Sequence, residues 1–208
     1  MLISGIIISM ILSYLLGSIP TGYIFAKTLK NIDIREHGSG NVGATNVFRT
    51  IGKIPGIIVF VIDFLKGFLS VIIIPLVIVK IFSIHVAYEY NGIFLVLCGA
   101  SAIIGHIWTV FLNFKGGKGV ATTAGVIGGI APLIFISSFL VWIIVFYLWK
   151  YVSLASILAG ISLPIFSVIY GADFYFVLFS GVFSIVGILS HRANIKRLLS
   201  GVENKISK

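Results

Sequence analysis

Residues 119–149 read GVATTAGVIGGIAPLIFISSFLVWIIVFYLW, which is 31 residues without a single charged side chain. As one α-helix this stretch would be about 46 Å long, well beyond the roughly 30 Å hydrocarbon core of a bilayer. Its middle contains Gly128, Gly129 and Pro132, residue types that allow a helix to turn or break. The stretch therefore predicts two membrane helices that meet near Ala131–Pro132.

The composition of the whole chain supports a membrane protein. Hydrophobic residues make up 59% of it and charged residues only 10%, whereas soluble domains carry about 25% charged residues. We expect one all-α integral membrane domain over residues 1–208, and we expect its first span to be retained and not cleaved as a signal peptide. Five further apolar stretches lie at 2–26, 54–79, 92–112, 152–170 and 174–190.

The charges between these stretches predict the topology. Basic residues are concentrated in the 27–53 segment, the 113–118 turn and the 191–208 tail, whereas the 80–91 connection is close to neutral. The positive-inside rule places the three basic segments in the cytoplasm. Six crossings would leave the tail outside, and dividing 119–149 in two resolves the conflict. The prediction is seven transmembrane helices, with the N-terminus outside and the C-terminus cytoplasmic.

The net charge of +9 indicates the kind of partner. Because the basic residues lie between apolar spans, the excess indicates topology and anionic ligands and not nucleic acid. Cys98 is the only cysteine and lies in an apolar run, so neither an internal disulfide nor a cysteine metal site can form.

The first candidate site is the run HGSGNVGATNVFR at residues 37–49. Closely spaced glycines let backbone N–H groups approach an anion, and a helix that starts near Asn41 would point its first amides at the same anion. The alternative is an interfacial turn capped by Ser and Asn. The candidate ligands are Gly38, Ser39, Gly40, Asn41, Gly43, Thr45, Asn46 and Arg49.

The second candidate site is FKGGKGVAT at residues 114–122. Free glycine amides, the ammonium groups of Lys115 and Lys118 and the start of a helix are together typical of a phosphate-binding loop, although GxxxxGK[ST] is absent. The alternative is a basic turn that only sets topology. Gly116 and Gly117 are the candidate backbone ligands. His106 is a functional candidate because it is ionisable within a span, or it satisfies a backbone carbonyl.

Further polar residues follow in the second half of the chain. Ser153 begins an apolar stretch, and the i, i+3 spacing of His191 and Asn194 places them on one helical face. The basic residues Lys196 and Arg197 bind either substrate or anionic lipid. Asp63 and Lys66, three residues apart within the 54–79 stretch, are expected to pair with each other or with the site, because unpaired charges in lipid are costly, and pairing with each other is the favoured alternative.

In this order the motifs resemble those of the bacterial acyl-phosphate:glycerol-3-phosphate acyltransferase family. The resemblance rests on GSGNVGATN at 38–46, DFLKG at 63–67, GH at 105–106, FKGGKGVAT at 114–122, VSLAS at 152–156 and HRANI at 191–195. It implies seven transmembrane helices in the bacterial plasma (inner) membrane and an active site facing the cytoplasm. It also implies acyl transfer from acyl phosphate to the 1-hydroxyl of glycerol 3-phosphate, giving lysophosphatidate and phosphate.

Residue roles are carried over from the resemblance as a hypothesis. The 38–46 loop would hold acyl phosphate, and Arg49, Lys115 or Lys118, Ser153, His191 and Asn194 would hold glycerol 3-phosphate. Ser39, Arg49, His106 and Lys115 are the catalytic candidates, and the proton acceptor is His106, His191 or an oxygen of the acyl phosphate itself. The scheme requires no cofactor and no metal, involves membrane lipid as the surroundings of the donor, and leaves the oligomeric state open.

Two other classes of protein compete with this interpretation. A transporter for organic phosphates predicts polar residues near both faces, but the outer connections 80–91 and 171–173 carry few phosphate ligands. A lipid-binding scaffold would not need two glycine-rich loops. The HxxxxD acyltransferase signature is absent, and the scattered carboxylates are unlike a two-acid mechanism.

Overall fold

A computed structural model describes the backbone of residues 2–82 and 88–206 and, within these, the side chains outside 88–91. Contacts divide the chain into two compact units, Met1–Ile130 (unit 1) and Ala131–Lys208 (unit 2). The single domain expected over 1–208 stays a prediction. Part of the near-neutral 80–91 connection lies outside the described residues.

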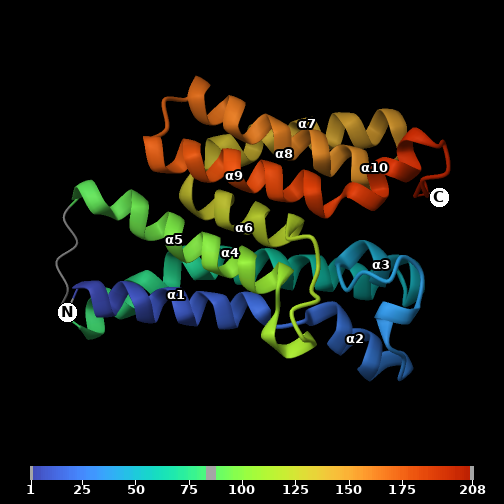
Figure 1. The fold of residues 1–208 in the computed structure, drawn as a ribbon, viewed down its shortest axis with the longest axis horizontal. Coiled ribbons are helices and arrows are strands. Elements are labelled where there is room, and N and C mark those ends of the chain that lie inside the picture. The colour runs from blue at the N-terminus through green and yellow to red at the C-terminus, as the bar shows by residue number, and fades with distance from the viewer. Residues whose placement is uncertain (1, 83–87, 207–208) are drawn as a thin grey trace. The chain divides into compact units, whose positions relative to one another are not determined.

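Every regular element in the described parts of the chain is helical (Figure 1). Unit 1 contains α1 (Leu2–Ser18), α2 (Thr21–Lys30), η1 (Ile34–Glu36), α3 (Ala44–Thr50), α4 (Lys53–Ile81), α5 (Tyr88–Ile107), η2 (Val110–Leu112) and α6 (Val120–Ile130). Unit 2 contains α7 (Pro132–Trp149), α8 (Val152–Ile169), α9 (Phe174–Ser190) and α10 (Arg192–Leu199).

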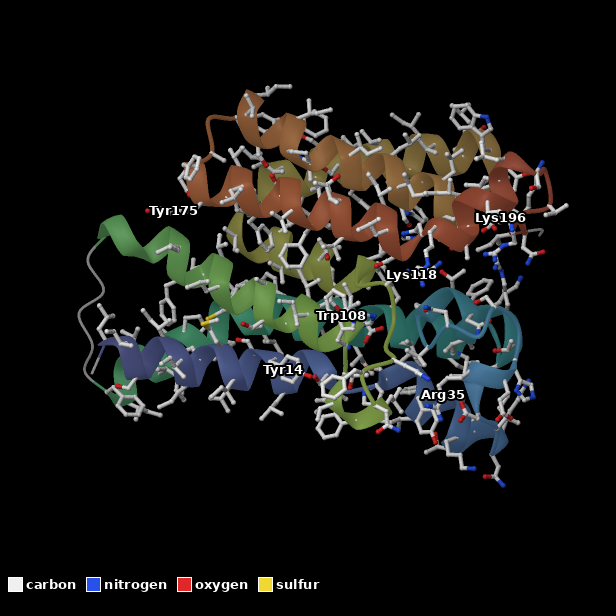
Figure 2. The ribbon with its side chains drawn as sticks, in the orientation of Figure 1. Tyr14, Arg35, Trp108, Lys118, Tyr175 and Lys196 are labelled. Atoms are coloured by element: carbon white, nitrogen blue, oxygen red, sulfur yellow. The ribbon has the colours of Figure 1, made fainter. Side chains whose placement is uncertain are left out.

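Helix α1 has the polarity expected in lipid. Its buried face is small or polar, with Gly5, Ser9, Ser13 and Gly17 at intervals of four residues, and packs against α5. Its exposed face is large and apolar, consisting of Ile3, Ile7, Ile11 and Leu15. Small residues let helix backbones approach closely where lipid supplies no hydrophobic drive, and the exposed apolar face matches the bilayer. Near the end of α1, the Tyr14 hydroxyl donates to the Trp108 carbonyl at 2.8 Å (Figure 2).

Helices α4 and α6 also pack against each other, so closely that their backbones touch (Figure 1). A Cβ at Gly67 of α4 would collide with the Thr122 carbonyl oxygen, and a Cβ at Gly125 of α6 would collide with the Phe64 carbonyl oxygen. The glycines of the 119–149 stretch thus serve packing as well as the break that the sequence predicts.

That predicted break is confirmed, because α6 ends at Ile130 and α7 begins at Pro132. Proline fits the first turn of a helix, where its missing N–H would have no intrahelical partner. A second break was not predicted. The apolar run 2–26 was expected to be one span, but α1 ends at Ser18 and α2 starts at Thr21, with Pro20 between them.

The described helices support a polytopic membrane protein. Five are long and apolar enough to cross a membrane when α1 and α2 are counted together, and six when α9 and α10, bent by 60°, are counted as one span. The remaining apolar helix is α6, whose 11 residues reach only about 16 Å. The all-helical membrane fold is therefore confirmed, whereas the count of seven spans is not.

Unit 2 is a layer of three long helices, in which α8 packs against both α7 and α9. Aromatic rings stack along one side of α7, from Phe135 through Phe139 and Trp142 to Phe146. The Trp142 indole N–H donates to Ser156 Oγ of α8 at 3.2 Å. The Lys150–Tyr151 turn joins α7 to α8, and the tail returns to it, since Ile206 N donates to the Lys150 carbonyl at 3.1 Å.

Candidate active site

The 37–49 segment folds as a loop that leads into the short helix α3. Gly38 and Gly40 have φ of +61° and +71°, which is the left-handed conformation that glycine adopts without penalty. Gly43 has φ of −78° and is the N-cap of α3, which begins at Ala44. The helix thus starts three residues after Asn41, whose side chain accepts from Gly43 N at 2.8 Å and forms a turn.

Asn46 holds this loop together. Its Oδ1 accepts from Ser39 N at 2.9 Å, and its Nδ2 donates to the carbonyls of His37 and Asn41, each at 2.9 Å. The side chain is 2% exposed. Asn46, predicted as a substrate ligand, thus contacts loop backbone. Ser39 and Arg49 are exposed and Thr45 is half-buried, so these side chains lie where a ligand can reach them.

We expect Gly38→Ala to disrupt the loop. A Cβ at Gly38 would collide with Asn46 Oδ1, the atom that accepts from Ser39 N. Gly171→Ala is the matched control, because Gly171 also has positive φ, +64°, but nothing lies within 4 Å of its added Cβ. Gly38→Ala should lower the activity of the protein about 10-fold or more, whereas Gly171→Ala should stay near wild type. Equal rates for the two variants would contradict this account of Asn46.

The second loop folds back onto the end of α5. Gly116 N donates to the Ile107 carbonyl at 2.9 Å, and Gly117 N donates to the His106 carbonyl at 3.0 Å. The free amides expected at these two glycines are therefore engaged, because the last carbonyls of a helix need donors. Both positions require glycine, since a Cβ would collide with the His106 carbonyl at Gly116 and with His106 Nε2 at Gly117. Lys118 follows on the same loop, just before α6 (Figure 2).

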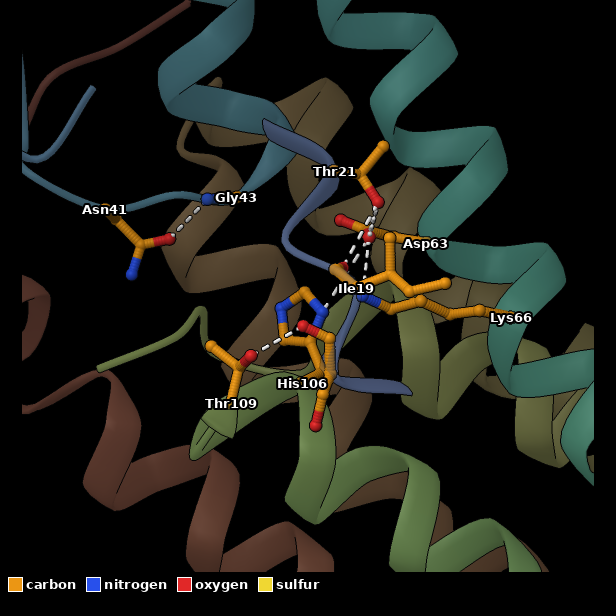
Figure 3. Close-up of polar contacts among 9 residues, drawn as sticks. Ile19, Thr21, Asn41, Gly43, Asp63, Lys66, His106 and Thr109 are labelled. Atoms are coloured by element: carbon orange, nitrogen blue, oxygen red, sulfur yellow. Dashed lines mark hydrogen bonds and ion pairs between the residues drawn. The ribbon is translucent and has the colours of Figure 1, made fainter. Parts of the chain in front are cut away.

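Beneath this loop lies a buried polar network (Figure 3). Lys66 Nζ is 2.8 Å from Asp63 Oδ1, so the predicted pairing of the two charges is confirmed. Asp63 Oδ1 also accepts from Thr21 Oγ1 at 3.1 Å. Lys66 Nζ donates to the Ile19 carbonyl at 3.0 Å. The ion pair thus contacts both sides of the break between α1 and α2. The sequence did not predict this contact.

His106 lies beside this network at the end of α5. It is 8% exposed, and its Nδ1 lies 3.8 Å from Asp63 Oδ1. A small pocket adjoins the ring, lined by Ser18, Ile19, Pro20, Thr21, Gly22, Val42, Asp63, Lys66, His106 and Thr109. Thr109 Oγ1 donates to the Ser18 carbonyl at 2.6 Å. His106 is thus buried against Gly116 and Gly117 of the glycine-rich loop, and its catalytic role stays a prediction.

In unit 2 the carboxylate of Glu203 contacts two of the predicted site residues, Ser153 and Asn194. Glu203 Oε1 accepts from Ser153 Oγ at 2.8 Å and from Asn194 Nδ2 at 2.7 Å. Its Oε2 accepts from Arg197 Nε at 2.7 Å. His191, the third predicted residue, contacts the Gly187 carbonyl through Nδ1 at 2.8 Å, at the end of α9. Sequence reasoning missed Glu203, although it is the sole acidic residue of the 191–208 tail.

The Glu203 carboxyl predicts a pH dependence of unit 2. Burial alone would raise its pKa, but hydrogen bonds from Asn194, Arg197 and Ser153 outweigh burial and hold the pKa below 4.5. A lowered pKa means that the ionised form stabilises the fold, so this stabilisation is present above pH 4.5 and is lost as pH falls through the lowered value. Glu203→Gln, which mimics the protonated form, should lower the thermal midpoint at pH 7 but not at the acid end. A pH-independent difference would contradict this role of Glu203.

The chain matches known proteins over nearly its whole length. The family model described as glycerol-3-phosphate acyltransferase covers residues 7–201. A glycerol-3-phosphate acyltransferase of Bacillus subtilis is 46% identical over 196 residues, which is 94% of this chain and 95% of the relative. Glycerol-3-phosphate acyltransferase 2 of Moorella thermoacetica is 41% identical over 201 residues, covering 96% of this chain and 97% of the relative.

Solved structures agree with these relatives. The crystal structure of PlsY (YgiH), an integral membrane glycerol 3-phosphate acyltransferase, in its glycerol 3-phosphate form is 43% identical with a TM-score of 0.85, covering 97% of this chain and 96% of that one. Its lysophosphatidic acid form is 42% identical with a TM-score of 0.82, covering 97% and 95%. The chain belongs to the glycerol-3-phosphate acyltransferase family of integral membrane proteins.

Proposed function

We propose that this protein transfers a fatty acyl group from acyl phosphate to the 1-hydroxyl of glycerol 3-phosphate, in the first step of phospholipid synthesis. The observation that carries the proposal is the likeness to a solved acyltransferase whose two forms are named for glycerol 3-phosphate and lysophosphatidic acid, the acceptor and the product of such a transfer. The buried small-residue faces and exposed apolar faces of the helices suit a donor with a long acyl tail.

The reaction balances without an added cofactor. The hydroxyl oxygen of glycerol 3-phosphate attacks the acyl carbonyl carbon, the bond between that carbon and the phosphate oxygen breaks, and phosphate leaves with the electron pair. The hydroxyl proton ends on the released phosphate. We infer that a phosphate oxygen of the donor accepts this proton, an inference that the burial of His106 against the 115–119 loop supports.

The residue assignment follows the two loops of unit 1 and the polar cluster of unit 2. The 38–46 loop, with exposed Ser39, binds the phosphate of the donor, and the cations of Arg49 and Lys115 or Lys118 bind the phosphate oxygens of glycerol 3-phosphate. In unit 2, Ser153, His191 and Asn194 bind glycerol 3-phosphate.

Purified protein with palmitoyl phosphate and glycerol 3-phosphate tests the proposed reaction. Lysophosphatidate should form with this donor and not with palmitoyl-CoA, and Ser39→Ala should lose most of the activity. Product from palmitoyl-CoA but not from palmitoyl phosphate would falsify the donor assignment. Full turnover by Ser39→Ala would remove the 38–46 loop from the donor site.

We also propose seven crossings of the bacterial inner membrane, with an outer N-terminus and a cytoplasmic active face. The basic 27–53, 113–118 and 191–208 segments support this orientation, and α6 would be the short crossing. In a Cys98→Ala background, Ser39→Cys and Asn204→Cys should both be shielded from an impermeant thiol reagent added outside intact cells. Labelling of only one of the two would contradict the topology.

A further inference from the structure

Two charges in the middle of unit 1 have no part in the proposed chemistry. Asp63 and Lys66 of α4 are only 2% and 4% exposed, and their ion pair lies within an apolar helix of 29 residues. Buried ion pairs in a membrane protein are costly and seldom add net stability, because desolvation opposes the attraction. The pair therefore has a role other than stability, and its hydrogen bonds indicate which.

One branch of these hydrogen bonds leads to the 38–46 loop. Lys66 Nζ holds the Ile19 carbonyl at 3.0 Å, and Asp63 Oδ1 holds the Thr21 hydroxyl at 3.1 Å. These contacts fix the break at which α2 begins. The next residue, Gly22, packs so closely on the loop that a Cβ there would collide with the Val42 carbonyl oxygen. The ion pair therefore supports the middle of the loop through Thr21 and Gly22.

The other branch leads to the 115–119 loop. His106 Nδ1 faces Asp63 Oδ1 at 3.8 Å (Figure 3), a separation too long for a direct hydrogen bond but close enough for the carboxylate to limit how the ring can turn. The other ring nitrogen, Nε2, lies so close to Gly117 that a Cβ added there would collide with it. The His106 carbonyl accepts from Gly117 N at 3.0 Å. Any movement of Asp63 that turns the imidazole therefore moves the loop that carries Lys115 and Lys118.

We propose that the Asp63–Lys66 ion pair is a positioning site that holds the 38–46 loop and the 115–119 loop at a fixed distance from each other. The reason is geometric, since one carboxylate oxygen contacts or faces groups that support each loop. This inference rests on the proposed acyltransferase function, in which the two loops hold the phosphate groups of different substrates. In this proposal Asp63 and Lys66 act on affinity and alignment through the loops and not by binding a substrate.

The test uses the neutral double variant Asp63→Asn/Lys66→Met in the full-length protein. Removing one charge alone would leave the other uncompensated and unfold the protein, whereas replacing both charges is often neutral for stability. The double variant should keep a thermal midpoint near that of wild type. It should nevertheless raise KM for both substrates and lower kcat/KM on the order of 10- to 100-fold, because the loops lose their common support.

A second variant separates the two branches and buries no charge. Thr21→Val keeps the shape of the side chain and removes the hydrogen bonds of its hydroxyl to Asp63 and to the Ile19 carbonyl, which hold the start of α2, so it should raise KM for acyl phosphate more than KM for glycerol 3-phosphate. Thr28→Val is the matched control, because Thr28 also lies in α2 but its hydroxyl bonds to the Ile24 carbonyl of the same helix. Thr28→Val should leave both KM values unchanged.

The outcomes distinguish this proposal from the function on which it rests. Wild-type protein that forms no lysophosphatidate would overturn the proposed function itself. If wild type is active and the folded double variant has wild-type KM values, the ion pair is structural only and the positioning proposal is overturned. If the double variant does not fold, Thr21→Val decides, and KM values equal to those of Thr28→Val overturn the proposal.

Discussion

Gly117→Ala is expected to lower kcat/KM for acyl transfer on the order of 100-fold, since misplacing groups by about 1 Å has effects of that size. The added Cβ would collide with His106 Nε2. The ring cannot move away freely, because its other edge faces Asp63 and the residue is buried. The loop must shift instead, and Lys115 and Lys118 shift with it.

Steady-state kinetics with both substrates measures this effect. Gly160→Ala is the control, because nothing lies within 4 Å of a Cβ added at that glycine of α8. The thermal midpoint of Gly117→Ala should stay close to that of wild type, since the change is confined to a loop. A Gly117→Ala protein with wild-type kcat/KM would show that the close contact with His106 does not place the loop.

Gly125→Ala is expected to destabilise unit 1 by roughly 1–3 kcal/mol, the usual cost of overpacking a tight contact. Its added Cβ would collide with the Phe64 carbonyl, which is backbone of α4 and cannot rotate away. The two helices also meet at Gly67, whose added Cβ would collide with the Thr122 carbonyl. Separating α4 from α6 at one glycine therefore loosens the whole contact.

Thermal unfolding in detergent micelles measures the loss, with Gly181→Ala as the matched control. Gly181 is a helical glycine of α9 with nothing within 4 Å of an added Cβ. Alanine there should be neutral or slightly stabilising, because it favours helix over glycine. Equal midpoints for Gly125→Ala and Gly181→Ala would contradict backbone-distance packing of α4 on α6.

Sequence patterns predicted one helix break and missed another, for physical reasons. The break before Pro132 was predictable because the 119–149 stretch is too long for one crossing. The break at Ile19–Pro20 lies in a run whose length suits a single span. The Ser18 carbonyl accepts from Thr109, and the Ile19 carbonyl accepts from Lys66 as well as from Thr21 N. Partners as distant in sequence as Thr109 and Lys66 leave no local pattern.

The candidate site shows the same division. The glycine-rich loops were found from their composition, and the Asp63–Lys66 pair was found from its spacing within an apolar run. The direction of the backbone amides of Gly116 and Gly117 was not predictable from composition. They donate to carbonyls at the end of α5, and only the folded loop brings these groups together. Glu203 was missed because only the folded tail brings its carboxylate to Ser153 and Asn194.

The central claim is that phosphate is the leaving group of an acyl transfer to glycerol 3-phosphate. The most direct measurement follows phosphate and lysophosphatidate together, in one reaction of the purified protein with palmitoyl phosphate, with and without glycerol 3-phosphate. The account predicts one phosphate released for each lysophosphatidate formed, and negligible release without the acceptor. Phosphate release at the same rate without glycerol 3-phosphate, or lysophosphatidate formed without phosphate release, would contradict it.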